Sequence, residues 1–286
     1  MTTLDARLNA FRPDLADESL RGRVEAARFT AGRPGRIVTP VADMLKAPDG
    51  AAGMNTQLVL GDEVRLFEAG GGWAWVQAGH DGYVGYVAGD AVGGQAPAPT
   101  HVVSAPRTFV YPGPDLRLPR RRALSMGSRL RVVGEAETRN TRYALLDGGE
   151  AVIAAHLLPA GTAAADYVAV AETLLHTPYL WGGTSGFGID CSGLVQLSMR
   201  MAGVPVLRDT DMQVASVGAP VDVSAGYADL KRGDLVFWKG HVAIMVDAAT
   251  MIHASGHAML VCLEPLADAI RRIGYLYGLP TAVRRP

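Results

Sequence analysis

The chain has 286 residues, 49% of them hydrophobic, which is enough for one large domain or two to three small ones with packed cores. Its 27 basic and 28 acidic residues nearly cancel, and no block of five or more basic residues stands out, so nucleic-acid binding is not expected. The two cysteines, Cys191 and Cys262, are too few for a disulfide scaffold, and we expect both to be free thiols in a reducing compartment.

The N-terminal residues 1–35 are predicted to form a helical leader. From Asp14 to Phe29 apolar side chains recur at roughly helical spacing, and the pattern ends at a Gly-Arg-Pro-Gly segment. Charged residues interrupt this region throughout, so we expect neither a signal peptide nor a membrane span. If residue 1 is the native start, the protein is expected in the cytoplasm.

Short runs rich in Val, Leu, Trp and Tyr, separated by Gly- and Pro-containing turns, fill residues 36–95. This texture predicts a small all-β barrel. A Gly/Pro/Ala linker closes the region, because such a segment sustains neither a helix nor a strand. Residues 100–160 repeat the strand-and-turn texture more weakly and are predicted to form a second small barrel. The remaining residues, 164–286, are expected to form the domain that carries the chemistry.

Four glycines crowd the segment before Cys191, and apolar residues at helical spacing follow it. They predict an amphipathic helix from about Asp190 to Gly203. The first turn of a helix carries unpaired backbone N–H groups at the positive end of its dipole, which favour a thiolate and can receive an oxyanion. Cys191 could instead be a small buried apolar residue. The glycines favour the nucleophile, because they let the backbone approach another group closely.

Three strands are predicted after this helix, over Gly233–Trp238, His241–Val246 and Met251–Ser255. His241 begins the second strand and His253 lies within the third. In an antiparallel sheet the two can lie side by side, with His241 accepting the thiol proton and His253 orienting the ring of His241.

A zinc site is the alternative, since Cys191, Cys262, His241, His253 and His257 include possible ligands. The segment from His253 to His257 contains a glycine and has the pattern of a strand followed by a turn, so these two histidines would not share a helical face. We therefore expect no metal and no cofactor, and we expect Cys262 to be a strand residue of the core.

Four motifs in this region resemble the NlpC/P60 family of cell-wall cysteine peptidases. They are Asp190–Leu194, Gly233–Phe237, His241–Ile244 and Ile252–Ser255. The resemblance implies an α+β papain-like fold, with the cysteine on a helix packed against an antiparallel sheet, and Cys191, His241 and His253 as the catalytic triad. It also implies a substrate-binding set made of Tyr179, Asp190, Ser192, Asp209 and Thr210.

The first predicted barrel resembles bacterial SH3 domains through Thr56–Val64, Trp73–Val76 and Asp81–Val87. Two such SH3-like barrels ahead of a peptidase resemble the dipeptidyl-peptidase VI branch of the family, which removes L-Ala-γ-D-Glu from the diamino acid of muropeptides. In that branch an acidic residue and a tyrosine of the first barrel bind the free amine of L-Ala. The counterparts here are Asp62 or Glu63, and Tyr83.

The function implied is a γ-D-glutamyl-diamino acid peptidase that recycles murein peptides through an acyl-enzyme. Its expected partner is a muropeptide, and neither nucleic acid nor a membrane is expected. Two alternatives stay open: a peptidoglycan-binding protein that the barrels anchor, and an amidase or acyltransferase on the same fold. The choice between diaminopimelate and lysine, and the oligomeric state, also stay open.

Overall fold

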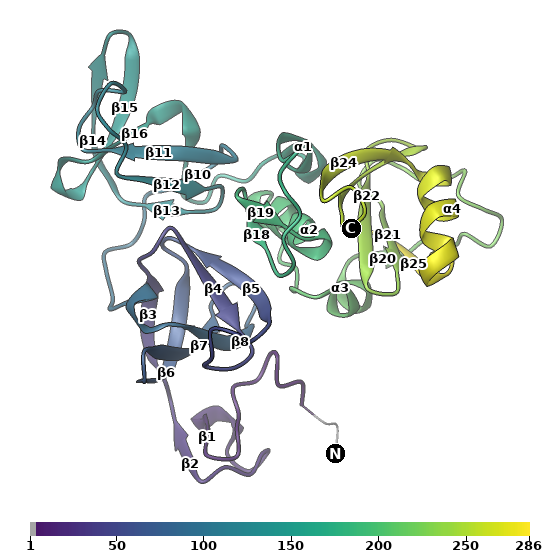
Figure 1. Cartoon of the computed structure of the whole chain (residues 1–286), viewed down its shortest axis with the longest axis horizontal. Coiled ribbons are helices and arrows are strands. Elements are labelled where there is room, and N and C mark those ends of the chain that lie inside the picture. The colour runs from purple at the N-terminus through teal and green to yellow at the C-terminus, as the bar shows by residue number, and fades with distance from the viewer. Residues whose placement is uncertain (1–3) are drawn as a thin grey trace. The chain divides into compact units, whose positions relative to one another are not determined.

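Residues 4–286 are described by the computed structural model and divide into two units, the first ending at Ala160 and the second running from Gly161 to Pro286 (Figure 1). The first unit is almost entirely β structure, whereas the second combines helices with one large sheet.

The predicted N-terminal helix is wrong. Leu15–Asp17 is strand β1, Glu18–Leu20 is a single 3-10 turn (η1), and Arg28–Thr30 is strand β2, which pairs with β1 in parallel. Leu15 is fully buried in a cluster with Phe67 and Trp75. The apolar spacing that favours a helix therefore reflects contacts with the neighbouring sheet, and these tertiary contacts override the local pattern.

The sheet that follows has seven antiparallel strands in the order β5-β4-β8-β7-β6-β3-β9. The strands are β3 Arg33–Ile37, β4 Val41–Leu45, β5 Met54–Val59, β6 Glu63–Gly70, β7 Trp73–Ala78, β8 Val84–Ala88 and β9 Val92–Gly93, with η2 at Gly89–Ala91. Turn glycines are needed where φ is positive, as at Gly61, whose φ is 84°.

The rest of the first unit forms two further antiparallel sheets, with strand orders β12-β11-β16-β15-β14 and β13-β10-β17. Their elements are β10 His101–Val103, β11 Arg107–Tyr111, β12 Arg122–Ser125, β13 Arg129–Leu130, β14 Val132–Thr138, β15 Thr141–Leu146, η3 Asp147–Gly149, β16 Ala151–Ile153, η4 Ala154–His156 and β17 Leu157–Pro159. These strands enclose a core that includes Val110, Leu124 and Val152, and Leu60 also packs against it.

The second unit is built on a six-stranded antiparallel sheet with the order β20-β25-β21-β22-β23-β24 (Figure 1). Its strands are β20 Ala219–Pro220, β21 Leu235–Trp238, β22 His241–Met245, β23 Thr250–Ser255, β24 Leu260–Pro265 and β25 Ala282–Arg285, and a small separate hairpin pairs β18 Thr184–Ser185 with β19 Gly188–Ile189. The helices are α1 Tyr167–Thr173, α2 Cys191–Met201, α3 Thr210–Ser216 and α4 Leu266–Tyr277.

Two helices of the second unit, α2 and α4, pack on the sheet that carries His241 and His253. Helix α2 packs against β22 and β23, which brings the start of the helix to the strands that carry the two histidines. Helix α4 packs on the sheet through Leu266, Ala269 and Ile273, in a cluster that also contains Trp238 and Met251. All three strands predicted around the histidines form, and they are antiparallel as expected.

Candidate active site

Cys191 is the first residue of α2, and Asp190 caps that helix. The Asp190 carboxylate accepts hydrogen bonds from the backbone N–H of Gly193 at 2.7 Å and of Gly182 at 2.8 Å. A Cβ atom at Gly193 would lie 2.2 Å from the carbonyl oxygen of Gly183, so only glycine fits there. The glycines therefore allow two segments of the backbone, at Gly183 and Gly193, to pack closely against each other. This packing holds Cys191 at the start of the helix.

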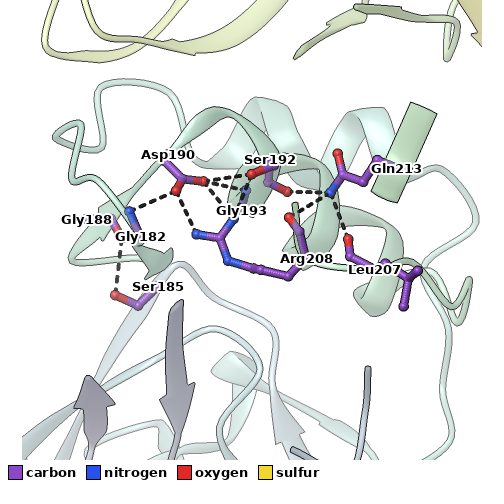
Figure 2. Close-up of polar contacts among 9 residues, drawn as sticks. All are labelled: Gly182, Ser185, Gly188, Asp190, Ser192, Gly193, Leu207, Arg208 and Gln213. Atoms are coloured by element: carbon purple, nitrogen blue, oxygen red, sulfur yellow. Dashed lines mark hydrogen bonds and ion pairs between the residues drawn. The ribbon is translucent and has the colours of Figure 1, made fainter. Parts of the chain in front are cut away.

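A buried ion pair fixes the same turn (Figure 2). The Arg208 guanidinium donates to both oxygens of Asp190, at 3.1 and 2.6 Å, and to the Ser192 hydroxyl at 2.7 Å. The side-chain amide of Gln213 donates to the carbonyl oxygen of Ser192 at 3.0 Å. Asp190 and Ser192, which the resemblance implies as substrate-binding residues, therefore also make hydrogen bonds within the chain that support the start of α2.

The two histidines lie side by side as predicted. Nε2 of His241, at the start of β22, is 2.9 Å from Nδ1 of His253 in β23. His253 is buried and His241 is half-buried. The backbone N–H of Val242, the residue after His241, lies close enough to the Cys191 sulfur to lower the pKa of the thiol. The nucleophile candidate and the histidine pair thus belong to one site.

Two charged residues that the sequence analysis missed, Glu264 and Arg272, continue the polar contacts beyond His253. Nε2 of His253 lies 3.1 Å from a carboxylate oxygen of Glu264 in β24. Arg272 of α4 donates to both oxygens of Glu264, at 3.0 and 2.5 Å. A charged residue inside the apolar run of β24 is the only sequence signal for Glu264, and it becomes specific only once the strand pairing is known.

The pKa values of Cys191 and His241 indicate that the thiol and the imidazole are both neutral at neutral pH. Burial, followed by the negative charge of Asp190, raises the pKa of the Cys191 thiol to about 11, although the N–H groups of Val242 and Ser192 and the charge of Arg208 act in the opposite direction. Burial, followed by the charges of His253 and Arg272, lowers the pKa of His241 to about 3. At this thiol the desolvation caused by burial outweighs the effect of the helix N-terminus.

The remaining predicted pocket residues of this unit lie near the helix start. Tyr179 is half-buried, and burial raises its pKa first, followed by the charges of Cys191 and Asp190, which places its hydroxyl in their electrostatic neighbourhood. Asp209 is the residue before α3 and Thr210 is its first residue, and both are half-buried directly after Arg208.

The residues predicted to bind the substrate amine lie in the first unit. Asp62 is buried, and its carboxylate accepts the backbone N–H of Val59 at 2.9 Å. Glu63 is exposed and pairs with Arg36 at 3.0 Å. Tyr83 is buried.

Among residues 4–286, no group of three or more His, Cys, Asp or Glu side chains has the arrangement of a metal site. His257 is exposed in the turn after β23, and Cys262 is half-buried opposite His253 rather than deep in a core. Within the same residues, no helix is both long and apolar enough to cross a membrane.

Comparison with protein families gives two matches. Residues 44–92 match the bacterial dipeptidyl-peptidase Sh3 domain, and residues 176–269 match the NlpC/P60 family. The chain carries an NlpC/P60 domain and a bacterial SH3 domain. It is a cysteine peptidase of the NlpC/P60 type, and the second match encloses Cys191, His241, His253 and Glu264.

Two similar curated proteins are each named gamma-D-glutamyl-L-lysine dipeptidyl-peptidase. The one from Bacillus cereus is 28% identical over 243 residues, covering 74% of this chain and 71% of that protein. The one from Bacillus subtilis is 34% identical over 116 residues, covering 37% of each. A crystal structure of an NlpC/P60 family protein from Bacillus cereus shares the fold with a TM-score of 0.71 at 23% identity, covering 88% of this chain and 99% of that one.

Proposed function

We propose that this NlpC/P60 peptidase hydrolyses the γ-D-glutamyl-diamino acid bond of peptidoglycan-derived peptides, with Cys191 as nucleophile, His241 as base and His253 as the residue that orients His241. The observation that carries the proposal is the position of Cys191 at the start of α2, beside the paired histidines of β22 and β23. The names of the two Bacillus relatives support this bond as the target.

In the proposed mechanism the Cys191 thiol gives its proton to the neutral ring of His241 as the sulfur attacks the γ-carbonyl carbon. The tetrahedral intermediate collapses, the C–N bond breaks, and the amine of the diamino acid leaves with the proton from His241. Water then attacks the thioester, His241 takes one of its protons, and the C–S bond breaks to release L-Ala-D-Glu and the free thiol. In the first turn of α2 the backbone N–H of Gly193 is bonded to Asp190, whereas that of Cys191 has no partner inside the helix and is available to a developing oxyanion.

The experiment that tests the proposal uses two tripeptides, L-Ala-γ-D-Glu-L-Lys and L-Ala-γ-D-Glu-meso-diaminopimelate. Mass spectrometry should show L-Ala-D-Glu and the free diamino acid with the wild type and not with Cys191→Ala. The two tripeptides compared directly give the diamino acid preference. An absence of both products, with folded wild-type protein, would contradict the proposal.

The same tripeptides separate the alternatives on this fold. An acyltransferase would pass the dipeptidyl group to an added amine in preference to water, and a binding protein would retain peptidoglycan without releasing a product. The SH3 match is compatible with binding. A protein that only binds peptidoglycan, however, does not need a thiol beside the paired rings of His241 and His253.

Three further points are part of the proposal. Residues 100–160 are a second SH3-like barrel, supported by their separate sheets and core. The protein acts in murein recycling in the cytoplasm, supported by two cysteines that form no disulfide. The substrate amine is recognised by Asp62 or Glu63 with Tyr83, supported by the match of their barrel to the dipeptidyl-peptidase Sh3 domain.

A further inference from the structure

The row of polar contacts that starts at His241 continues beyond His253 to a carboxylate and a guanidinium. We propose that Glu264, held by Arg272, is a positioning residue that fixes the proton arrangement of both histidines and leaves Nδ1 of His241 able to accept the Cys191 proton. The proposal rests on the proposed function only in taking His241 as the base. Its evidence is the 3.1 Å contact between Glu264 and His253 and the two bonds from Arg272.

A neutral imidazole has one N–H, which donates, and one nitrogen lone pair, which accepts. An ionised carboxylate only accepts, so Glu264 requires the proton of His253 to be on Nε2. Nδ1 of His253 then has the lone pair and accepts from Nε2–H of His241, 2.9 Å away. The lone pair of His241 is thereby left on Nδ1, the nitrogen that does not contact His253.

The opposite arrangement would disable the base. If Nδ1 of His253 carried the proton, it would donate to Nε2 of His241, and the His241 proton would lie on Nδ1. No lone pair would then be left for the thiol. The histidine pair alone permits both arrangements, and the charge of Glu264 selects one of them.

The fold builds this contact from three elements. His253 lies opposite Cys262 in the pairing of β23 with β24, and Glu264 is two residues further along β24, on the same face. Arg272 reaches the carboxylate from α4, and the side chain of Glu264 is only 18% exposed. The charged and titratable groups facing this carboxylate are His253, Arg272 and the Cys262 thiol.

Glu264 is ionised at neutral pH. The close contact with His253, helped by the bonds from Arg272, lowers the pKa of Glu264 to about 2. A carboxylate with this pKa cannot offer its own proton to His253 at neutral pH, so it acts as an acceptor throughout the reaction.

The first test is kinetic and compares Glu264→Gln, Arg272→Met and Arg271→Met in the full chain. A glutamine amide presents an N–H as well as an oxygen, so it permits both proton arrangements of His253. We expect kcat to fall about tenfold or more while KM stays within about twofold, because no contact with substrate is lost. Arg272→Met should give a smaller fall, and Arg271→Met, an exposed neighbour on α4 that pairs with Asp268, should match the wild type.

The second test needs no substrate. In protein labelled with ¹⁵N-histidine, long-range ¹H–¹⁵N spectra distinguish the two neutral tautomers, and the signals of the pair are assigned by their loss in His241→Ala and His253→Ala. We expect both rings as Nε2–H tautomers in the wild type and in Arg271→Met, and a mixture in Glu264→Gln. The spectra remain informative if the tripeptides are not cut, so failure of the proposed function is distinguishable from failure of this proposal.

Unchanged tautomers in Glu264→Gln overturn the proposal, even if kcat falls, because Glu264 would then only tie β24 to α4. Unchanged kcat in a variant that does cut the tripeptide also overturns it. If Glu264→Gln does not fold, Glu264→Ala, which also removes the carboxylate, decides by the same two measurements.

Discussion

The pKa of His241 sets the pH range over which the site can react. Burial and the charges of His253 and Arg272 lower this pKa to about 3, so the ring keeps its lone pair at pH values where a free imidazole, with a pKa of about 6.5, is protonated. We predict that kcat/KM for the tripeptide stays flat from about pH 5 to about pH 7, with no acidic limb near pH 6.5. An acidic limb at that pH would show that the base is an unshifted group.

The two histidines should differ in how much activity they carry. Cleavage of the tripeptide should fall by about 10⁴-fold or more in His241→Ala, because the thiol, with its pKa of about 11, then has no acceptor for its proton. His253→Ala should be milder, because orienting a base contributes less than being the base. His257→Ala, an exposed histidine four residues further on, is the control and should match the wild type. Equal losses in all three would contradict the assignment.

At the scale of single residues, sequence reasoning found the groups that local motifs mark and missed those that strand pairing creates. Cys191, His241 and His253 could be predicted because a helix start and two neighbouring strands bring them together. Glu264 could not, because its contact depends on the register between β23 and β24. The contact between Asp190 and Arg208 could not be predicted either, because the sequence gives the type of each residue but not its partner.

The start of α2 depends on the ion pair between Asp190 and Arg208, which is almost fully removed from solvent. Arg208→Met leaves the Asp190 charge buried without its main partner. We predict a loss of about 3 kcal/mol or more in the free energy of unfolding of the second unit, measured by calorimetry on the full chain. Arg232→Met removes an exposed pair with Asp166 and Glu172, and should cost less than about 1 kcal/mol. Equal losses would show that the buried pair does not stabilise α2.

At the scale of elements, the prediction was right where the local pattern and the packing agree. The helix predicted from Asp190 to Gly203 is α2, since all of its residues except Arg200 are buried in the unit and its apolar side chains pack on the sheet. The helix predicted from Asp14 to Phe29 does not form, because Leu15 packs on Trp75 and the backbone pairs as strands instead. The spacing of apolar residues indicates which side chains are buried. A short segment can bury the same side chains as a helix or as a strand, so the spacing alone does not decide between them.

For the whole molecule, the turn pattern and the linker were enough to predict β-rich regions ahead of a mixed α/β unit, and the structure has this order. The role of the SH3 domain beside the peptidase domain could not be predicted from local sequence patterns, because this role depends on the substrate. We propose that this role is recognition of the free amine of L-Ala, which is positive at neutral pH.

This proposal predicts a strong preference for free over N-acetylated tripeptide. Acetylation removes the positive charge and leaves a carboxylate without its partner, and a charge-assisted hydrogen bond contributes about 1.5 to 3 kcal/mol, so kcat/KM should fall by about two orders of magnitude. Intact peptidoglycan, whose L-Ala nitrogen is acylated, should be spared for the same reason. Equal cleavage of both peptides by the wild type would exclude amine recognition.

The carboxylate responsible is identified by testing Asp62→Asn and Glu63→Gln on both peptides. Asp62 already accepts the N–H of Val59, so Asp62→Asn requires a parallel measurement of stability, whereas Glu63 is exposed and Glu63→Gln should leave the fold unchanged. The variant that loses the preference for the free amine, with kcat/KM on the acetylated peptide unchanged, names the residue. Arg36→Met removes the charge that pairs with Glu63 and is the matched control: if Glu63 binds the amine, freeing it from Arg36 should increase the preference or leave it unchanged, and a loss of preference would mean that the pair acts only through the fold of its barrel.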